Sequence, residues 1–208
     1  MKKKGFTLAE ILITIVVIGV VSAITVPSIM QTTEKQEFVA GLKKANSVLH
    51  QGLSAIAREN GYPLGDYSFL IEEKDFMDEF AKVTSVAKVL NNEIKLKEYS
   101  WLNGESGETA IINPKAIITT DGQEFIYSNS FGNYGISEED FAHQLLGIGV
   151  DVNGERKPNR VGYDIFFFYL INGKGIVPTG AKSFDECNRQ NSGVTCTSKV
   201  LKEGRISY

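Results

Sequence analysis

Residues 11–33 read ILITIVVIGVVSAITVPSIMQTT and contain no charged side chain. A helix of about 20 such residues spans a hydrocarbon core about 30 Å thick, so this segment is long enough to cross a membrane. Lysines occupy positions 2–4 before it, and the next basic residue is Lys35. Because basic flanking residues stay on the cytoplasmic side, the pattern predicts a cytoplasmic N-terminus and export of the rest of the chain.

A carboxylate, Glu10, lies at the start of this apolar run. Within a bilayer it costs about 2.5–3.5 kcal/mol at a helix centre and less near the helix end. An ordinary secretory signal cleaved after Ala23 is the alternative, but a disposable signal gains nothing from such a residue. The best-placed partner for Glu10 is the α-amino group of Phe6 that cleavage after Gly5 would create.

The order of these features, KKKG, then FTLAE, then an apolar helix, resembles the leader and N-terminus of type IV pilins and type II secretion pseudopilins. The resemblance implies processing between Gly5 and Phe6 by a prepilin peptidase, followed by N-methylation of Phe6. It gives Glu10 a role in assembly, because Glu10 would pair with the Phe6 amine of an adjacent subunit. The other partners it implies are copies of the chain, related pilins, the inner-membrane assembly machinery and the lipid bilayer. The expected location is the bacterial inner membrane, crossed once, and then a periplasmic or cell-surface filament.

An amphipathic pattern follows the apolar segment. Apolar residues recur every three or four positions from Phe38 to Ile56, with charged residues between them. Asn60-Gly61-Tyr62-Pro63 ends the pattern, because Gly takes the left-handed position and Pro cannot continue the helix. One long helix is therefore expected, and Pro27 should kink it or open it locally.

The expected organisation has three parts. The ranges are a leader at 1–5, a helix at 6–60 with its membrane anchor at about 6–30 and its amphipathic stalk at about 31–60, and a globular head at 61–208.

The head is large enough for one domain. The helical spacing of Phe76, Met77 and Phe80 predicts a second helix within 72–90. Strand patterns follow at 109–112, 116–120, 124–127, 161–171 and 175–177. The run 164–170, DIFFFYL, is apolar on both alternate faces, so both faces should be covered. Because strands follow helices, we expect an α+β fold, similar to pilins, with an antiparallel sheet packed on the long helix.

Oxygen-bearing side chains gather in the loop 151–164. Asp151 and Asn153 lie at alternate positions, and Asp164 arrives from the next strand. Calcium binds six to eight oxygens, which this spacing begins to supply, although the loop is not an EF-hand. The loop is similar in position to the calcium site of major pseudopilins but departs from their motif. The alternative is a loop in which Asp151 and Asn153 bond their own backbone and Asp164 holds it closed.

Cys187 and Cys196 are the only cysteines, and both lie on the exported side, where a disulfide persists. A bond between them would close a loop of about ten residues and stabilise the fold by roughly 2.5–3 kcal/mol in the chain-entropy model. Many pilins similarly have a C-terminal disulfide loop. Two free thiols, or half of a metal site, are the alternatives.

The net charge and the absence of catalytic motifs argue against two classes of function, nucleic-acid binding and catalysis. The formal net charge is −3, and it becomes more acidic when the leader lysines are removed, so nucleic acid is an unlikely partner. The sequence has no G-x-S-x-G, P-loop, H-E-x-x-H or C-x-x-C motif, and its acidic run after Ser137 is typical of a helix cap. We therefore expect no enzyme and no required cofactor.

Three hypotheses follow for the function. The first is a structural subunit of a type IV pilus or a type II secretion pseudopilus. The second is a minor, pilin-like subunit that caps a filament or recognises a surface, DNA or cargo. The third is a secreted protein released after Ala23.

Overall fold

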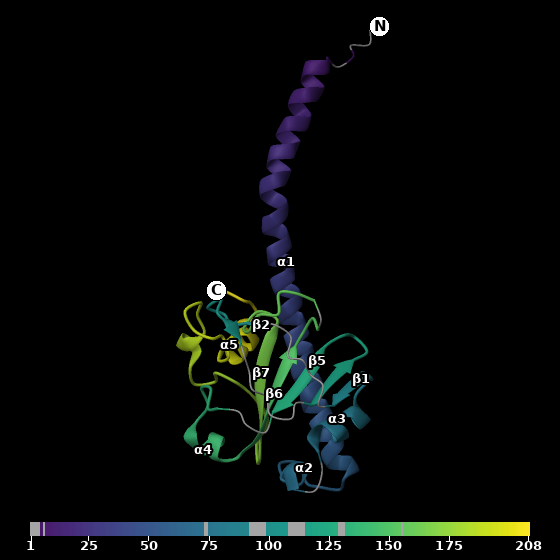
Figure 1. The fold of residues 1–208 in the computed structure, drawn as a ribbon, viewed down its shortest axis with the longest axis vertical. Helices are drawn as coiled ribbons and strands as arrows, with labels where there is room; N and C mark the ends of the chain where they lie inside the picture. The colour runs from purple at the N-terminus through teal and green to yellow at the C-terminus, as the bar shows by residue number, and fades with distance from the viewer. Residues whose placement is uncertain are drawn as a thin grey trace. The chain divides into compact units, whose positions relative to one another are not determined.

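The computed structural model describes residues 5, 7–72, 75–91, 99–107, 115–128, 132–154 and 156–208. The chain divides into two compact units, residues 1–37 and residues 38–208. Helix α1 (Leu8–Glu59) is 52 residues long, and its last part, residues 38–59, belongs to the second unit (Figure 1). The predicted long helix is therefore confirmed.

Helix α1 ends where the sequence predicts. Gly61 has a φ of 74°, in the left-handed region, and the N–H of Tyr62 donates to the carbonyl of Ala57 at 3.0 Å. This pairing satisfies one of the carbonyls that a helix end leaves free. The local opening expected at Pro27 is not seen, because α1 is helical without interruption on both sides of that residue. Loss of a single N–H from a 52-residue helix leaves the neighbouring hydrogen bonds to hold it.

The second unit is built on a six-stranded antiparallel sheet with the order β1-β4-β5-β6-β7-β8. Its strands are β1 (Val86–Asn91), β4 (Lys115–Thr119), β5 (Glu124–Ser128), β6 (Gln144–Asp151), β7 (Ile165–Ile171) and β8 (Gly175–Pro178). The shorter elements are α2 (Phe69–Glu72), α3 (Phe76–Val83), β2 (Tyr99–Ser100), β3 (Ser106–Gly107), α4 (Glu138–Ala142), η1 (Phe184–Glu186) and α5 (Cys196–Glu203). The architecture is α+β and pilin-like, as expected.

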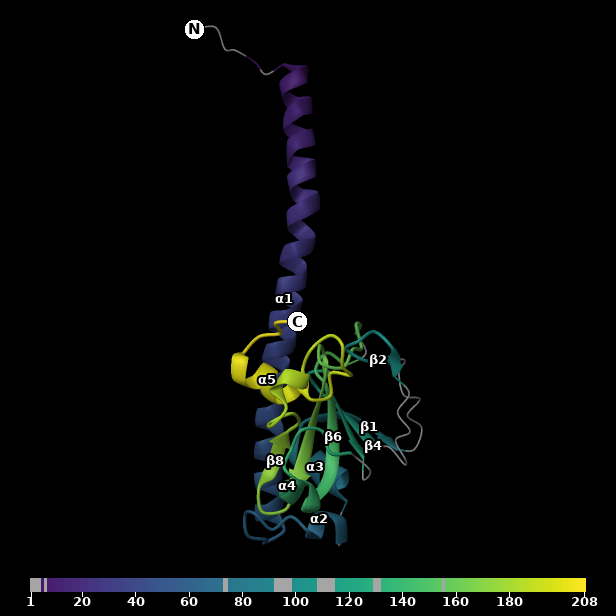
Figure 2. The ribbon, with the colours of Figure 1, turned by 90° about the vertical axis from the view of Figure 1, so that its left-hand side faces the viewer.

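Residues 38–59 of α1 pack along one face of this sheet (Figure 2). Leu42, Leu49 and Ile56 are fully buried there at helical spacing. They share one core with Phe166 and Phe168 of β7. The same apolar stripe that the sequence shows therefore supplies one side of the core of the second unit.

The opposite face of β7 is also covered, as its two-sided apolar pattern predicts. Tyr169 and Ile171 are buried against Ile136, which precedes α4. The Tyr169 hydroxyl donates to the carbonyl of Gly132 and accepts from the N–H of Tyr134, both at 2.7 Å. These bonds satisfy the one polar atom of a ring that is otherwise in an apolar site.

Two predictions about local structure need correction, and one strand was missed. The second helix ends at Val83, because Val86 pairs with Thr119 as the first residue of β1. The strand predicted from 161 begins only at Ile165. Strand β6, which no pattern indicated, contains two glycines, and a Cβ on Gly149 would lie 3.2 Å from the Phe167 ring. The strand predicted at 109–112 lies outside the described residues.

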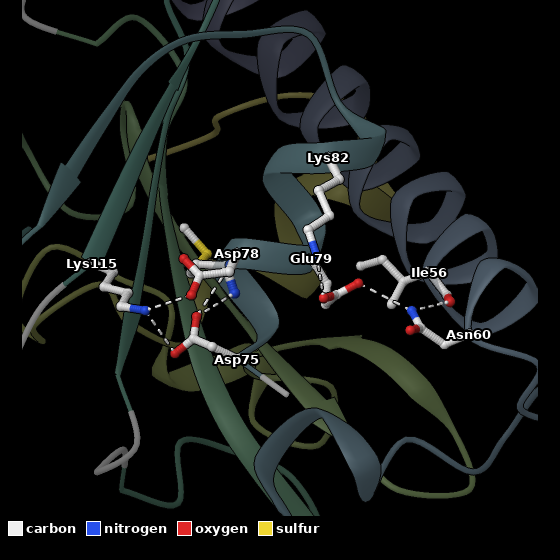
Figure 3. A network of polar contacts seen from close by, with 8 residues as sticks. Ile56, Asn60, Asp75, Asp78, Glu79, Lys82 and Lys115 are labelled. Carbon is white, nitrogen blue, oxygen red and sulfur yellow. Dashed lines mark hydrogen bonds and ion pairs between the residues drawn. The ribbon is translucent and has the colours of Figure 1, made fainter. Parts of the chain in front are cut away.

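Polar contacts fix α3 between the end of α1 and the sheet (Figure 3). The carboxylate of Glu79 is largely buried and accepts hydrogen bonds from Asn60 at 3.1 Å and from Lys82 at 2.6 Å. On the other side, Lys115 of β4 lies 3.1 Å from Asp75 and from Asp78. Helix α3 is thus joined to the C-terminal end of α1 on one side and to β4 on the other.

Candidate functional sites

The first turn of α1 contains a reciprocal hydrogen-bond pair. Glu10 Oε2 accepts from the N–H of Thr7 at 2.7 Å and from its hydroxyl at 2.8 Å. In return, the Thr7 hydroxyl accepts from the N–H of Glu10 at 3.3 Å. This is a capping box, which satisfies N–H groups that a helix start leaves free. Glu10 therefore has a role within its own chain, besides the assembly role predicted for it.

The predicted processing site adjoins this capping box. Gly5 is exposed, as a cleavage site requires, whereas Phe6 lies outside the described residues. Pairing of Glu10 with the Phe6 amine of another subunit stays a prediction.

The surface of α1 in the first unit is apolar and exposed. Leu8 is 80% exposed and Ile24 is 72% exposed. The hydroxyls of Thr14, Thr25 and Thr32 each donate to a main-chain carbonyl three or four residues earlier. Such internal hydrogen bonds are what an apolar solvent demands of polar side chains. Among the described residues, α1 is the one helix that is long and apolar enough to cross a membrane.

Comparison with protein families adds the decisive observation. Residues 1–26 match the family model of the prokaryotic N-terminal methylation motif. The chain carries the hallmark segment of type IV pilins and pseudopilins. No curated protein and no solved structure matches the chain significantly. The methylation motif supports a pilin-like or pseudopilin precursor, and together with the apolar helix it fits membrane anchoring.

The loop after β6 is closed by hydrogen bonds to its own backbone. Asp164 is fully buried, and its two carboxylate oxygens accept from the N–H groups of Asn159 at 2.8 Å and Arg160 at 2.6 Å. Asp151 accepts from the N–H of Asn153 at 3.2 Å. Burial raises the pKa of Asp164, although these N–H groups act in the opposite direction. The contacts correspond to the second interpretation of this loop, in which Asp164 holds it closed.

Two amide oxygens of the same loop lack partners. Asn153 Oδ1 and Asn159 Oδ1 are buried and accept no hydrogen bond from the described residues. Buried acceptors of this kind usually meet a water or a cation. No group of three or more Asp, Glu, His or Cys side chains converges as metal ligands within the described ranges. A cation here would therefore depend on amide oxygens as well as on Asp151 and Asp164.

The predicted disulfide is present between Cys187 and Cys196, whose Cα atoms are 4.8 Å apart. Both cysteines are buried, and they pack with Leu102 in a small separate cluster. The bond joins the end of η1 to the first residue of α5, a helix that the sequence did not indicate. Because both of its sulfur-bearing residues are buried, this disulfide is part of the packed interior of the second unit.

Proposed function

We propose that the chain is a structural subunit of a type IV pilus or a type II secretion pseudopilus. The observation that carries this proposal is the methylation motif on an exposed apolar helix, ahead of an α+β unit. A prepilin peptidase cleaves after Gly5 on the cytoplasmic face of the bacterial inner membrane. The unit of residues 38–208 lies on the far side, and the chain has no enzymatic activity.

Assembly follows from the physics of the first unit. Its Ile, Val and Leu side chains exchange lipid for the helices of other subunits at little hydrophobic cost. Glu10 then gains the methylated Phe6 amine of a neighbour as a charged partner, and a charge-assisted pair is strong where water is excluded. The prepilin peptidase, the inner-membrane assembly machinery and copies of the chain or related pilins are its partners.

The mass of the mature N-terminus tests this function. We expect a chain that begins with N-methylated Phe6 and is recovered in filaments sheared from cells. A chain that begins at Ile24 would instead mean an ordinary secreted protein. High abundance in the sheared fraction identifies a major subunit, whereas a rare component identifies a cap.

We also propose that the loop 151–164 holds a calcium ion. The two buried amide oxygens without partners, Asn153 Oδ1 and Asn159 Oδ1, support this. The carboxylates of Asp151 and Asp164 can accept more than one contact per oxygen and would supply the charge.

Melting of the full chain in detergent, with calcium and then with a chelator, tests the ion. Calcium should raise the melting temperature, magnesium should do so less, and the chelator should reverse the shift. An unchanged melting temperature would mean that hydrogen bonds alone close the loop.

A further inference from the structure

The second unit has a groove of about 740 Å³ beside α1. It runs between the helix, the segment from α3 to β1, and the turn from β4 to β5. Its lining residues are Lys44, Val48, His50, Gln51, Gly52, Ser54, Ala55, Arg58, Val83, Thr84, Ser85, Thr119, Thr120 and Asp121.

The polar part of this groove consists mainly of uncharged side chains, and its basic residues, Lys44, His50 and Arg58, all lie on α1. Asp121 is the one carboxylate among the lining residues, and Lys44 binds it at 2.5 Å. His50 and Arg58 are exposed along the same helix, and Arg58 pairs with no carboxylate in the described part of the chain. Val48 and Ala55, which are partly exposed, add an apolar strip. With Lys44 paired to Asp121, Arg58 is the cation that the groove can offer, so the groove suits a segment that presents a carboxylate beside some apolar surface.

The same unit presents an acidic element on its other flank. Helix α4 opens with Glu138, Glu139 and Asp140, and none of its residues is buried. Asp140 forms an ion pair with Lys174, and Glu138 accepts a hydrogen bond from Asn133, whereas Glu139 has no ion-pair partner among the described residues. Figure 1 shows α4 on one side of the sheet, and α3 and β1 on the other.

We propose that this groove receives helix α4 of a second copy of the chain. The inference rests on the proposed filament function and names one contact between subunits. Because groove and helix lie on opposite flanks, the contact is head-to-tail and leaves both outer flanks free for further copies. A contact of this kind repeats from copy to copy and builds an open filament when its rotation does not close into a ring. Charge complementarity selects the register between copies, and the many repeats in a filament make a weak single contact effective.

Cysteine cross-linking in cells tests the contact on the full chain. One copy carries Gln51→Cys in the groove and a co-expressed copy carries Glu138→Cys, with the disulfide of Cys187 and Cys196 left in place. We expect a cross-linked pair of these two copies in assembled material. The matched control, Ser207→Cys with Glu138→Cys, places an equally exposed thiol outside the groove and should give none. Filaments of normal yield without the groove cross-link would overturn the contact while leaving the filament function intact.

Charge reversal provides a second readout. Arg58→Glu should lower filament yield about fivefold, the size of one exposed ion pair, and Glu139→Arg should do the same. The chain with both changes should recover, because each groove then meets an opposite charge again. Arg189→Glu, an exposed change of equal charge elsewhere, should have no effect. A double variant whose filament yield is no higher than that of the single variants contradicts the proposed contact. Failure of the unmodified chain to form filaments would contradict both the contact and the proposed function.

Discussion

Thr7 and Glu10 show how one residue can serve two purposes. Glu10 is at the third position of α1, where its carboxylate caps the helix through Thr7. The same side chain is the sole acid of the apolar segment, which suits pairing between subunits. These roles differ in what they require, since capping needs an acceptor and pairing needs a charge.

Two substitutions separate the roles of Glu10. Glu10→Gln keeps an acceptor for the capping box but removes the charge, whereas Glu10→Ala removes both and costs the helix start about 1 kcal/mol. We expect both variants to be cleaved after Gly5 and both to fail to assemble, as measured by N-terminal mass and by filament yield. Normal filaments from Glu10→Gln would show that capping alone is needed.

Asp140 gives a second prediction at this scale, for pH. The hydrogen bond from Lys174 lowers the pKa of Asp140 below its ordinary value, while burial acts in the opposite direction. Since the folded pKa is the lower one, the stabilising contribution is present above the ordinary value of 3.8 and disappears as pH falls through the folded pKa. Urea unfolding at several pH values should therefore show wild type and Asp140→Asn converging in acid. Lys174→Met should converge with wild type in the same window, and parallel curves would refute the pairing.

At the scale of elements, helices α1 and α3 pack closely against each other at Gly52. Gly52 of α1 is buried against the ring of Phe80, which is itself fully buried. The helix pattern of the sequence identifies the buried stripe but not the closeness of approach. A glycine in mid-helix, which helix propensity alone disfavours, is explained by this contact.

Substitution of Gly52 tests that packing. In Gly52→Ala the new Cβ would lie 2.4 Å from Phe80 Cε2, so the buried Phe80 ring must shift. Alanine favours the helix by about 1 kcal/mol, but overpacking costs about 1–3 kcal/mol, so we expect lower stability in urea unfolding. Gly19→Ala in the same helix, where no atom lies within 4 Å, should leave the unfolding of the second unit unchanged. A stabilised Gly52→Ala variant would contradict the packing.

At the scale of the whole molecule, the two units depend differently on their surroundings. The first has an exposed apolar surface and no buried residue among those described. The second has a core that begins at Phe38 and includes the stripe of α1 from Leu42 to Ile56. No described residue of the first unit belongs to that core, whereas residues 38–59 of α1 form part of it.

Truncation at two positions tests this dependence. A chain of residues 35–208 should be soluble without detergent and should melt within a few degrees of the full chain, because it keeps the whole core. A chain of residues 61–208 loses Leu42, Leu49 and Ile56 and should not fold. Circular dichroism and thermal melting measure both. Cooperative melting of the shorter chain would mean that the sheet has a sufficient core of its own.

Local sequence determined the features that depend on a short stretch of chain. The apolar run predicted a helix long enough to cross a membrane, residues 1–26 carry the N-terminal methylation motif, and Asn60-Gly61-Tyr62-Pro63 predicted the end of α1. Runs of strand-forming residues predicted β4, β5, β7 and β8, because each strand is continuous in sequence. Helix spacing and strand alternation are local physics, so they can be read without the fold.

Tertiary structure decided what depends on distant partners. Strand β6 exists because β5 and β7 flank it, with Gly149 making room for Phe167. Val86 lies in β1 rather than in the predicted helix because it pairs with Thr119 of β4. The groove beside α1 and the acidic flank at α4 come from separate parts of the chain, so only folding sets their places on the sheet. Pairing and burial between distant residues have no signature in a single sequence, and they fix both the core and the surfaces through which copies can meet.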